Sequence, residues 1–302
     1  MWLFFALFSY FLFSAVIIID KYFLEKPLPN PKVFTFYTAI AGTIFLIFIP
    51  FWLEFPGADI LILNFAAGGV FIFALFFLYA AFKLDEISKI AASVGSLSAI
   101  FIYFLNGLMT TDIKFLTKLD MLGLLFLLLG SIVILFPLNR KVFLAVFAAS
   151  ILYAVFFILA KLVYLSQPFL SGFLWIRIGA LFWGLAFLFF GAVRKNLAAL
   201  KIPKNFSFKH AAFILSIVFI GKLGLGGIAN IFQNVAISFA SVEQLPLIKG
   251  IEGVQYIFIL LFALILTKKY PQILKEEAAS KFLFQKLAGI VIIMAGAIFL
   301  NF

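Results

Sequence analysis

The sequence contains no cysteine and only one histidine, His210. Disulfides, iron–sulfur clusters, haem–thiolate centres and Cys/His zinc sites all require these residues, so none of them is expected. Intramembrane metalloproteases need clusters of His and Glu, which one histidine in a basic loop cannot supply. We therefore expect no metal, no cofactor, no catalytic residues and no enzyme activity.

Charged residues are also scarce, at 12% of 302 residues. Hydrophobic residues make up 66% and include 45 Phe, whereas a soluble domain is about half apolar. Such a chain cannot cover itself with polar surface, so we expect an integral membrane protein in a lipid bilayer. Its apolar runs are about 20 residues long, the length of a helix that crosses the hydrocarbon core. The predicted fold class is therefore all-α.

Charged or proline-containing stretches separate ten such runs. The first run lacks a basic leader and an A-x-A cleavage pattern, which indicates a retained span and not a signal peptide. The sequence predicts ten transmembrane helices, at residues 2–20, 33–52, 60–82, 87–109, 121–138, 142–164, 169–193, 211–238, 241–267 and 282–302.

The fifth and tenth runs share a spacing of small residues. Each has two glycines seven residues apart, Gly123 and Gly130 in one and Gly289 and Gly296 in the other. A seven-residue step returns to the same helix face, so each pair predicts a flat strip for helix packing.

Other features also recur between the two halves of the chain. The first and sixth runs both end near a lysine, at Lys21 and Lys161. The chain is therefore interpreted as two five-helix repeats, residues 1–140 and 141–302. Because five is odd, the repeats would insert with opposite orientation. Such 5+5 inverted repeats are typical of secondary transporters that bind substrate between the halves.

The net charge is +11, and the cations gather on one side of the predicted spans. Loops after odd-numbered spans contain seventeen Lys and Arg, and the opposite loops contain three. This bias places the odd loops in the cytoplasm and both termini outside. We expect a multi-pass protein of the cell (inner) membrane that does not bind nucleic acid; whether it forms a homodimer is open.

The ten spans, the glycine-spaced helices that close each half, and the helix entrances AAFKLDEISK and VAISFASVEQ resemble the drug/metabolite transporter superfamily, in particular its EamA-like branch. The resemblance covers essentially the whole chain. It implies alternating-access transport of metabolites, amino acids, sugars or drugs. The chain departs from many relatives after the fourth span, where MTTDIKFLT contains no Glu.

The ninth predicted span has the most polar residues. Lys249 and Glu252 are three residues apart and share a helix face, which Gln255 and Tyr256 continue. The pair could bind the two ends of a zwitterion, Glu252 could exchange a coupling proton, or the two could form a structural ion pair. Pro246 frees backbone carbonyls that another group must satisfy.

Candidate substrate-binding residues also lie in two neighbouring spans. Asn230 and Asn234 are four residues apart on the eighth span and could contact substrate or another helix. Arg177 in the seventh span could form a structural ion pair with Glu243 or Glu252, or it could hold an anion in a cavity. The ion pair is the favoured interpretation.

Together these features predict a secondary-active transporter of small solutes that works by alternating access. The alternative within the same class is a flippase for a lipid-linked substrate. An intramembrane aspartyl protease needs two buried aspartates, and the five aspartates are all predicted at helix ends. A purely structural membrane protein is disfavoured by the charges in the ninth span.

Overall fold

The structure is a computed structural model of the chain. It describes residues 1–25, 28–109, 117–136, 139–199, 209–269 and 280–299. Within these ranges the chain forms helices and no strand, as the predicted all-α class requires. The first half contains α1 (Trp2–Glu25), α2 (Pro31–Ala41), the 3-10 helix η1 (Gly42–Phe48), α3 (Ile49–Trp52), α4 (Ala58–Leu84), α5 (Ile87–Met109) and α6 (Lys118–Leu135).

The second half of the chain has the same helical character. It contains α7 (Arg140–Ser166), α8 (Phe169–Ala186), η2 (Phe187–Phe189), α9 (Gly191–Ala199), α10 (Lys209–Phe239), η3 (Val242–Gln244), α11 (Leu245–Ile251), α12 (Gly253–Lys269) and α13 (Ser280–Phe299).

Seven segments of the described chain are long and apolar enough to cross a membrane. They are Trp2–Glu25, Pro31–Trp52, Ala58–Leu84, Ile87–Gly107, Lys118–Leu135, Arg140–Ser166 and Phe169–Phe189. A shorter apolar helix covers Phe284–Phe299. The all-helical prediction is confirmed, and the seven segments indicate a multi-pass membrane protein. The count of ten spans stays a prediction.

Three predicted spans are not single α-helices. The span at 33–52 changes to 3-10 geometry at Gly42, ahead of Pro50, which cannot donate a backbone hydrogen bond. The span at 169–193 leaves the α-helix after Ala186 and is extended at Phe190. The third, at 241–267, is interrupted in its middle and forms part of the candidate site.

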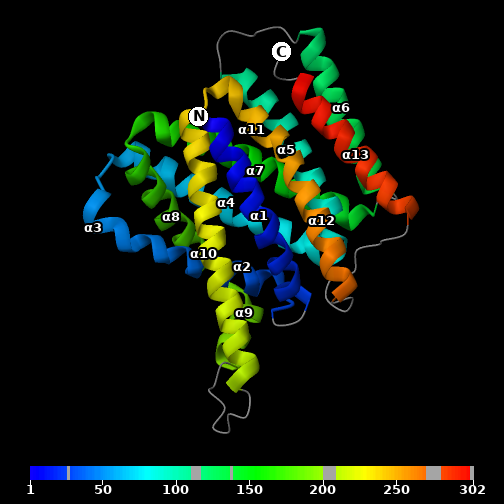
Figure 1. Cartoon of the computed structure of the whole chain (residues 1–302). Coiled ribbons are helices and arrows are strands. Elements are labelled where there is room, and N and C mark those ends of the chain that lie inside the picture. Colours follow the sequence, from blue (N-terminus) through cyan, green and yellow to red (C-terminus); the bar gives the residue numbers. More distant parts are fainter. Residues whose placement is uncertain (26–27, 110–116, 137–138, 200–208, 270–279, 300–302) are drawn as a thin grey trace.

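The helices pack as one bundle around α4, which contacts α7 on one side and α8 on another (Figure 1). α1 lies against α10, and α5 lies between α7 and the segment α11–α12. α6 and α13 pair with each other at the edge of the bundle. α1 begins and α13 ends on the same side of the bundle.

The contact between α6 and α13 is built on glycines. A Cβ atom added at Gly130 would lie 2.6 Å from Cγ1 of Ile293 and 2.9 Å from the backbone oxygen of Gly289. A Cβ atom added at Gly296 would lie 2.8 Å from the backbone oxygen of Gly123. All four glycines of the two spaced pairs therefore lie where the helix backbones approach each other, which lets dispersion contacts accumulate along the pair.

We predict that Gly130→Ala lowers the thermal stability of the purified protein, because the added methyl group overfills the α6–α13 contact. Overpacking costs about 1–3 kcal/mol, more than the gain of about 1 kcal/mol from replacing a helical glycine. The control is Gly107→Ala in α5, where nothing lies within 4 Å of the added Cβ. Thermal unfolding in detergent should show a lower Tm for the first variant only. Equal Tm values would contradict the packing account.

Candidate functional site

The ninth predicted span is broken at its centre, between α11 and α12. In a continuous helix the backbone N–H of Glu252 would bond to the oxygen of Ile248. Here it donates to the oxygen of Lys249, at 3.2 Å. The Ile248 oxygen instead accepts a hydrogen bond of 2.7 Å from the Tyr10 hydroxyl of α1. A side chain from the first half thus satisfies the carbonyl that the break releases.

A second carbonyl of this span also accepts a hydrogen bond from the first half of the chain. Pro246 has no N–H, so the oxygen of Val242 accepts instead from the backbone N–H of Leu245, three residues ahead at the end of η3. The amide Nδ2 of Asn106, in α5, donates to that oxygen at 2.7 Å. The turn that contains the proline is therefore stabilised both by its own backbone and by a neighbouring helix.

A charged pair lies at the break. Nζ of Lys249 lies 2.6 Å from Oε2 of Glu252, and both residues are buried. Lys249 lies in the last turn of α11 and Glu252 directly precedes α12, so each charge lies near the helix end whose dipole it complements. The Lys249 ammonium also lies over the rings of Tyr153, at 4.7 Å, and Phe157, at 5.1 Å.

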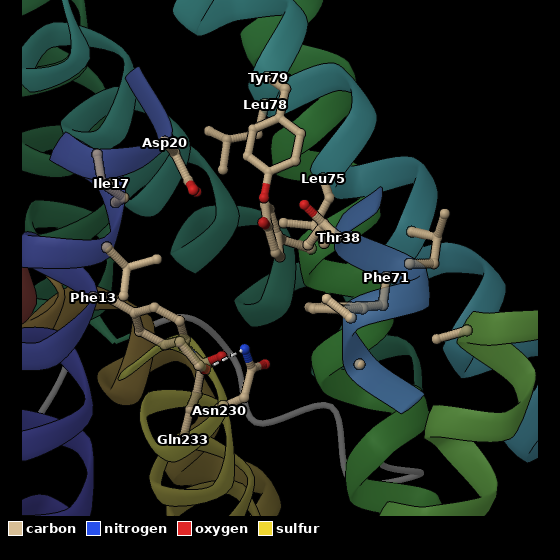
Figure 2. A pocket seen from close by; sticks show the side chains of 18 of the residues that line it. Phe13, Ile17, Asp20, Thr38, Phe71, Leu75, Leu78, Tyr79, Asn230 and Gln233 are labelled. Atoms are coloured by element: carbon tan, nitrogen blue, oxygen red, sulfur yellow. Dashed lines mark hydrogen bonds between the residues drawn. The ribbon is translucent and has the colours of Figure 1, made fainter. Parts of the chain in front are cut away.

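These residues border a central cavity with about 120 Å³ of space accessible to water. Its wall is formed by α1, α2, η1, α4 and α5 from the first half and by α7, α8, α10, α11 and α12 from the second. Figure 2 shows Asp20 of α1 and Tyr79 of α4 pointing toward the same space, with Asn230 and Gln233 of α10 on another wall. Most of the remaining lining is apolar, including Phe71.

A second charged pair on the cavity wall joins the two halves of the chain. Nζ of Lys222 in α10 lies 2.9 Å from Oδ1 of Asp20 in α1. The same ammonium lies 3.4 Å from the Thr38 hydroxyl and 4.6 Å from the Phe34 ring centroid.

The prediction that Asp20 lies at a helix end is wrong. α1 continues to Glu25, so the carboxylate lies inside the helix and only 4% of the residue is exposed. Lys222 likewise lies well inside α10 and is 3% exposed. Opposite charges in two distant spans were the available signal, but only the fold reveals that they meet.

Arg177 does not form the ion pair that was favoured for it. Among the described residues it has no acidic partner: Glu243 is exposed in η3, and Glu252 is engaged by Lys249. Nη2 of Arg177 instead donates to Oδ1 of Asn230, at 3.0 Å. Its guanidinium carbon lies 4.8, 5.1 and 5.9 Å from the ring centroids of Phe173, Phe71 and Phe45.

The structure brings five of the seven candidate substrate-binding residues to the cavity wall. These are Lys249, Glu252, Gln255, Asn230 and Arg177. The other two pack against neighbouring helices: Asn234 accepts a hydrogen bond of 2.7 Å from the Tyr164 hydroxyl, and Tyr256 lies against Gly95 of α5. Both are buried and do not line the cavity.

No family model matches the chain, and no curated protein matches it. A solved structure, described only as a crystal structure of a protein, superimposes with a TM-score of 0.53. It is 18% identical, and the match covers 96% of each chain. At this identity the similarity shows a shared fold over nearly the whole length and nothing about function.

We predict that Tyr10→Phe destabilises the protein although the ring is kept. The substitution removes the hydroxyl donor and leaves the Ile248 carbonyl unpaired in the apolar interior, at a cost of about 1–3 kcal/mol. The matched control is Tyr22→Phe, because Tyr22 is half-buried in the same helix and its hydroxyl makes no hydrogen bond to described residues. A Tm decrease confined to the position 10 variant is expected. If both variants have the same Tm as the wild type, the stability of the break does not depend on this hydrogen bond.

Proposed function

We propose that this protein is a secondary-active transporter of small solutes that binds substrate in the central cavity and exposes it to each side in turn. The observation that supports this most strongly is the cavity itself: it lies between the two halves, beside a broken helix, and is lined by five charged residues. Discontinuous helices and charged groups near the middle of a bundle are features of transporter binding sites. Each buried charge costs about 2.5–3.5 kcal/mol on insertion scales, so an arrangement of five has a functional reason.

A repeated contact supports the 5+5 inverted repeat that this proposal includes. Nζ of Lys21 in α1 donates to the backbone oxygen of Phe82, near the end of α4, at 2.5 Å. Nζ of Lys161 in α7 donates to the backbone oxygen of Ser238, near the end of α10, at 3.0 Å. In the proposed numbering of spans, the first caps the third and the sixth caps the eighth. Equivalent lysines therefore cap equivalent helices in the two halves.

A difference between equivalent contacts supports alternating access. α4 and α8 are in direct backbone contact, because a Cβ atom added at Gly179 would lie 2.8 Å from Cα of Phe65. The equivalent pair in the proposed repeat is α10 with α2 and η1, and the cavity lies between them. Nothing lies within 4 Å of a Cβ atom added at Gly42 or Gly224. This second pair makes its contacts through side chains: a Cβ atom added at Gly227 would lie 2.5 Å from the Phe45 ring, and Nζ of Lys222 lies 3.4 Å from the Thr38 hydroxyl. One pair is therefore in close backbone contact and its counterpart is held by side chains, a difference that alternating access would exchange between the two pairs.

The proposed orientation places the lysine-rich loops in the cytoplasm of a cell (inner) membrane. At the ends of α1 and α4 and the starts of α5 and α13, cations and carboxylates form a cluster. Lys21 lies 3.2 Å from Glu25, Lys89 lies 2.7 Å from Glu86, and Lys286 also pairs with Glu86. These lysines belong to the side of the chain with the larger cation count, which the positive-inside rule assigns to the cytoplasm.

We predict that removal of the Glu252 charge at the break lowers the transport rate. The test uses proteoliposomes and a panel of amino acids, sugars, organic acids and quaternary ammonium ions, with uptake or transport current as the readout. Glu252→Gln should lower the rate for the transported solute by about tenfold or more, equivalent to about 1.4 kcal/mol. Glu54→Gln, at an exposed carboxylate away from the cavity, should transport like the wild type.

A double variant separates function from structure. Lys249→Met combined with Glu252→Gln leaves no unpaired charge, so it should keep a near wild-type Tm. A folded double variant that does not transport supports a functional role for the pair. A double variant that transports at the wild-type rate, or a wild-type protein that moves no member of the panel, would contradict the proposal.

A further inference from the structure

The charges that line the cavity do not balance. Asp20 and Lys222 form one pair, and Lys249 and Glu252 form another. Arg177 is the fifth charged residue on the wall and has no acidic partner among the described residues. Because arginine stays protonated in proteins, the cavity holds one positive charge in excess.

The guanidinium of Arg177 is also short of hydrogen-bond acceptors. The residue is 8% exposed. Nη2 donates to Asn230, but the buried Nε has no hydrogen-bond partner in the described part of the chain. The three phenylalanine rings around it offer cation–π stabilisation of about 0.5–2 kcal/mol. That is less than the several kcal/mol needed to bury an ion without a counter-charge.

Gln255 adds a second group without partners in the same cavity. It is 1% exposed, and neither its amide nitrogen nor its amide oxygen has a hydrogen-bond partner in the described structure. It lines the cavity in the first turn of α12. Buried polar groups are nearly always hydrogen-bonded, so a fully buried amide that faces a cavity indicates a polar ligand.

Size and polarity restrict the ligand further. A cavity of about 120 Å³ is close to the roughly 150 Å³ cavity that accepts one benzene molecule. The phenylalanines near Arg177 favour an apolar body. One excess positive charge matches a monoanion, whereas a phosphate ester at neutral pH has a charge of about −1.5 to −2. An ammonium group would find both cavity carboxylates already engaged by lysines.

We propose that the substrate of this site is a small monocarboxylate with an apolar body about as large as a benzene ring, and that Arg177 binds its carboxylate. This inference rests on the proposed transport function. The planar guanidinium presents paired N–H donors that match a carboxylate, and Asn230 holds it in place. Gln255 supplies a further hydrogen bond inside the cavity. Substrate binding then neutralises the one unpaired charge on the wall.

The test measures binding to purified wild-type protein in detergent with compounds that share one body and differ in charge. These are benzoate, benzamide, benzylammonium, phenylalanine and phenyl phosphate, and palmitate tests for a lipid-derived acid. Benzoate should raise the Tm in a concentration-dependent manner and should bind at least about tenfold more tightly than the other ring compounds. A preference for palmitate over benzoate, or equal binding of benzamide and benzoate, would overturn the inference.

Variants at Arg177 separate a binding role from a structural one. Arg177→Gln should weaken benzoate binding by at least tenfold, while the Tm without ligand stays equal to or above that of the wild type because an unpaired buried charge is gone. Arg177→Lys keeps the charge without the planar donors and should bind benzoate with intermediate affinity. Arg194→Gln, at an exposed arginine in α9, is the matched control and should bind benzoate normally.

The outcomes for substrate class and for transport are distinguishable. If Arg177→Gln binds benzoate like the wild type, or lowers the Tm in the absence of ligand, the assigned role of Arg177 is wrong. If proteoliposomes move another class of solute and Arg177→Gln does not affect the rate, this inference fails and the transport function stands. If benzoate binds through Arg177 but no solute is transported, the binding site stands and the transport function fails.

Discussion

The structure depends on one constraint: polar groups buried in hydrocarbon must find their partners inside the protein. The broken ninth span meets it with help from distant helices. The carbonyl released at the break, that of Ile248, accepts a hydrogen bond from Tyr10, and Asn106 donates to the carbonyl of Val242. Both donors belong to the first half of the chain, so packing of the two halves stabilises the broken span. The same contacts that join the halves thus place the charges of the break, Lys249 among them, beside the cavity.

The two ion pairs of the cavity differ in sequence separation, so they contribute differently to the packing of the two halves. Lys249 and Glu252 are three residues apart, so their pairing is local and follows from helix geometry. Asp20 and Lys222 come from α1 and α10 and meet only when the halves pack. A buried pair adds little net stability, but removal of one partner is strongly destabilising. The long-range pair therefore favours the packed arrangement over alternatives in which one of its charges is left alone.

Much of the fold was predictable because long apolar runs specify membrane helices, and α5 has the predicted bounds of 87–109. The Lys249–Glu252 pair was predictable for the same reason: helical spacing places both residues on one face. Asp20 was misplaced because the apolar run ends there, whereas α1 continues to Glu25. The hydrogen bond between Arg177 and Asn230 depends on how two helices are juxtaposed, which no spacing within either helix encodes. Local periodicity predicts the helices, whereas the contacts between side chains of different helices can be identified only from the folded structure.

The two halves of the proposed repeat differ in chemistry. α5 is continuous, and its serines serve helix packing: Ser96 bonds with Ser131 of α6, and Ser98 donates to the Ser150 backbone oxygen of α7. Its counterpart in the proposed repeat, α11–α12, is broken and contains the Lys249–Glu252 pair. In the same way Arg177 has no charged counterpart in α2, where Thr38 is the polar residue on the cavity wall. In the proposed transport cycle the two repeats would exchange their contacts, while the polar groups of the second repeat would hold a ligand in one orientation.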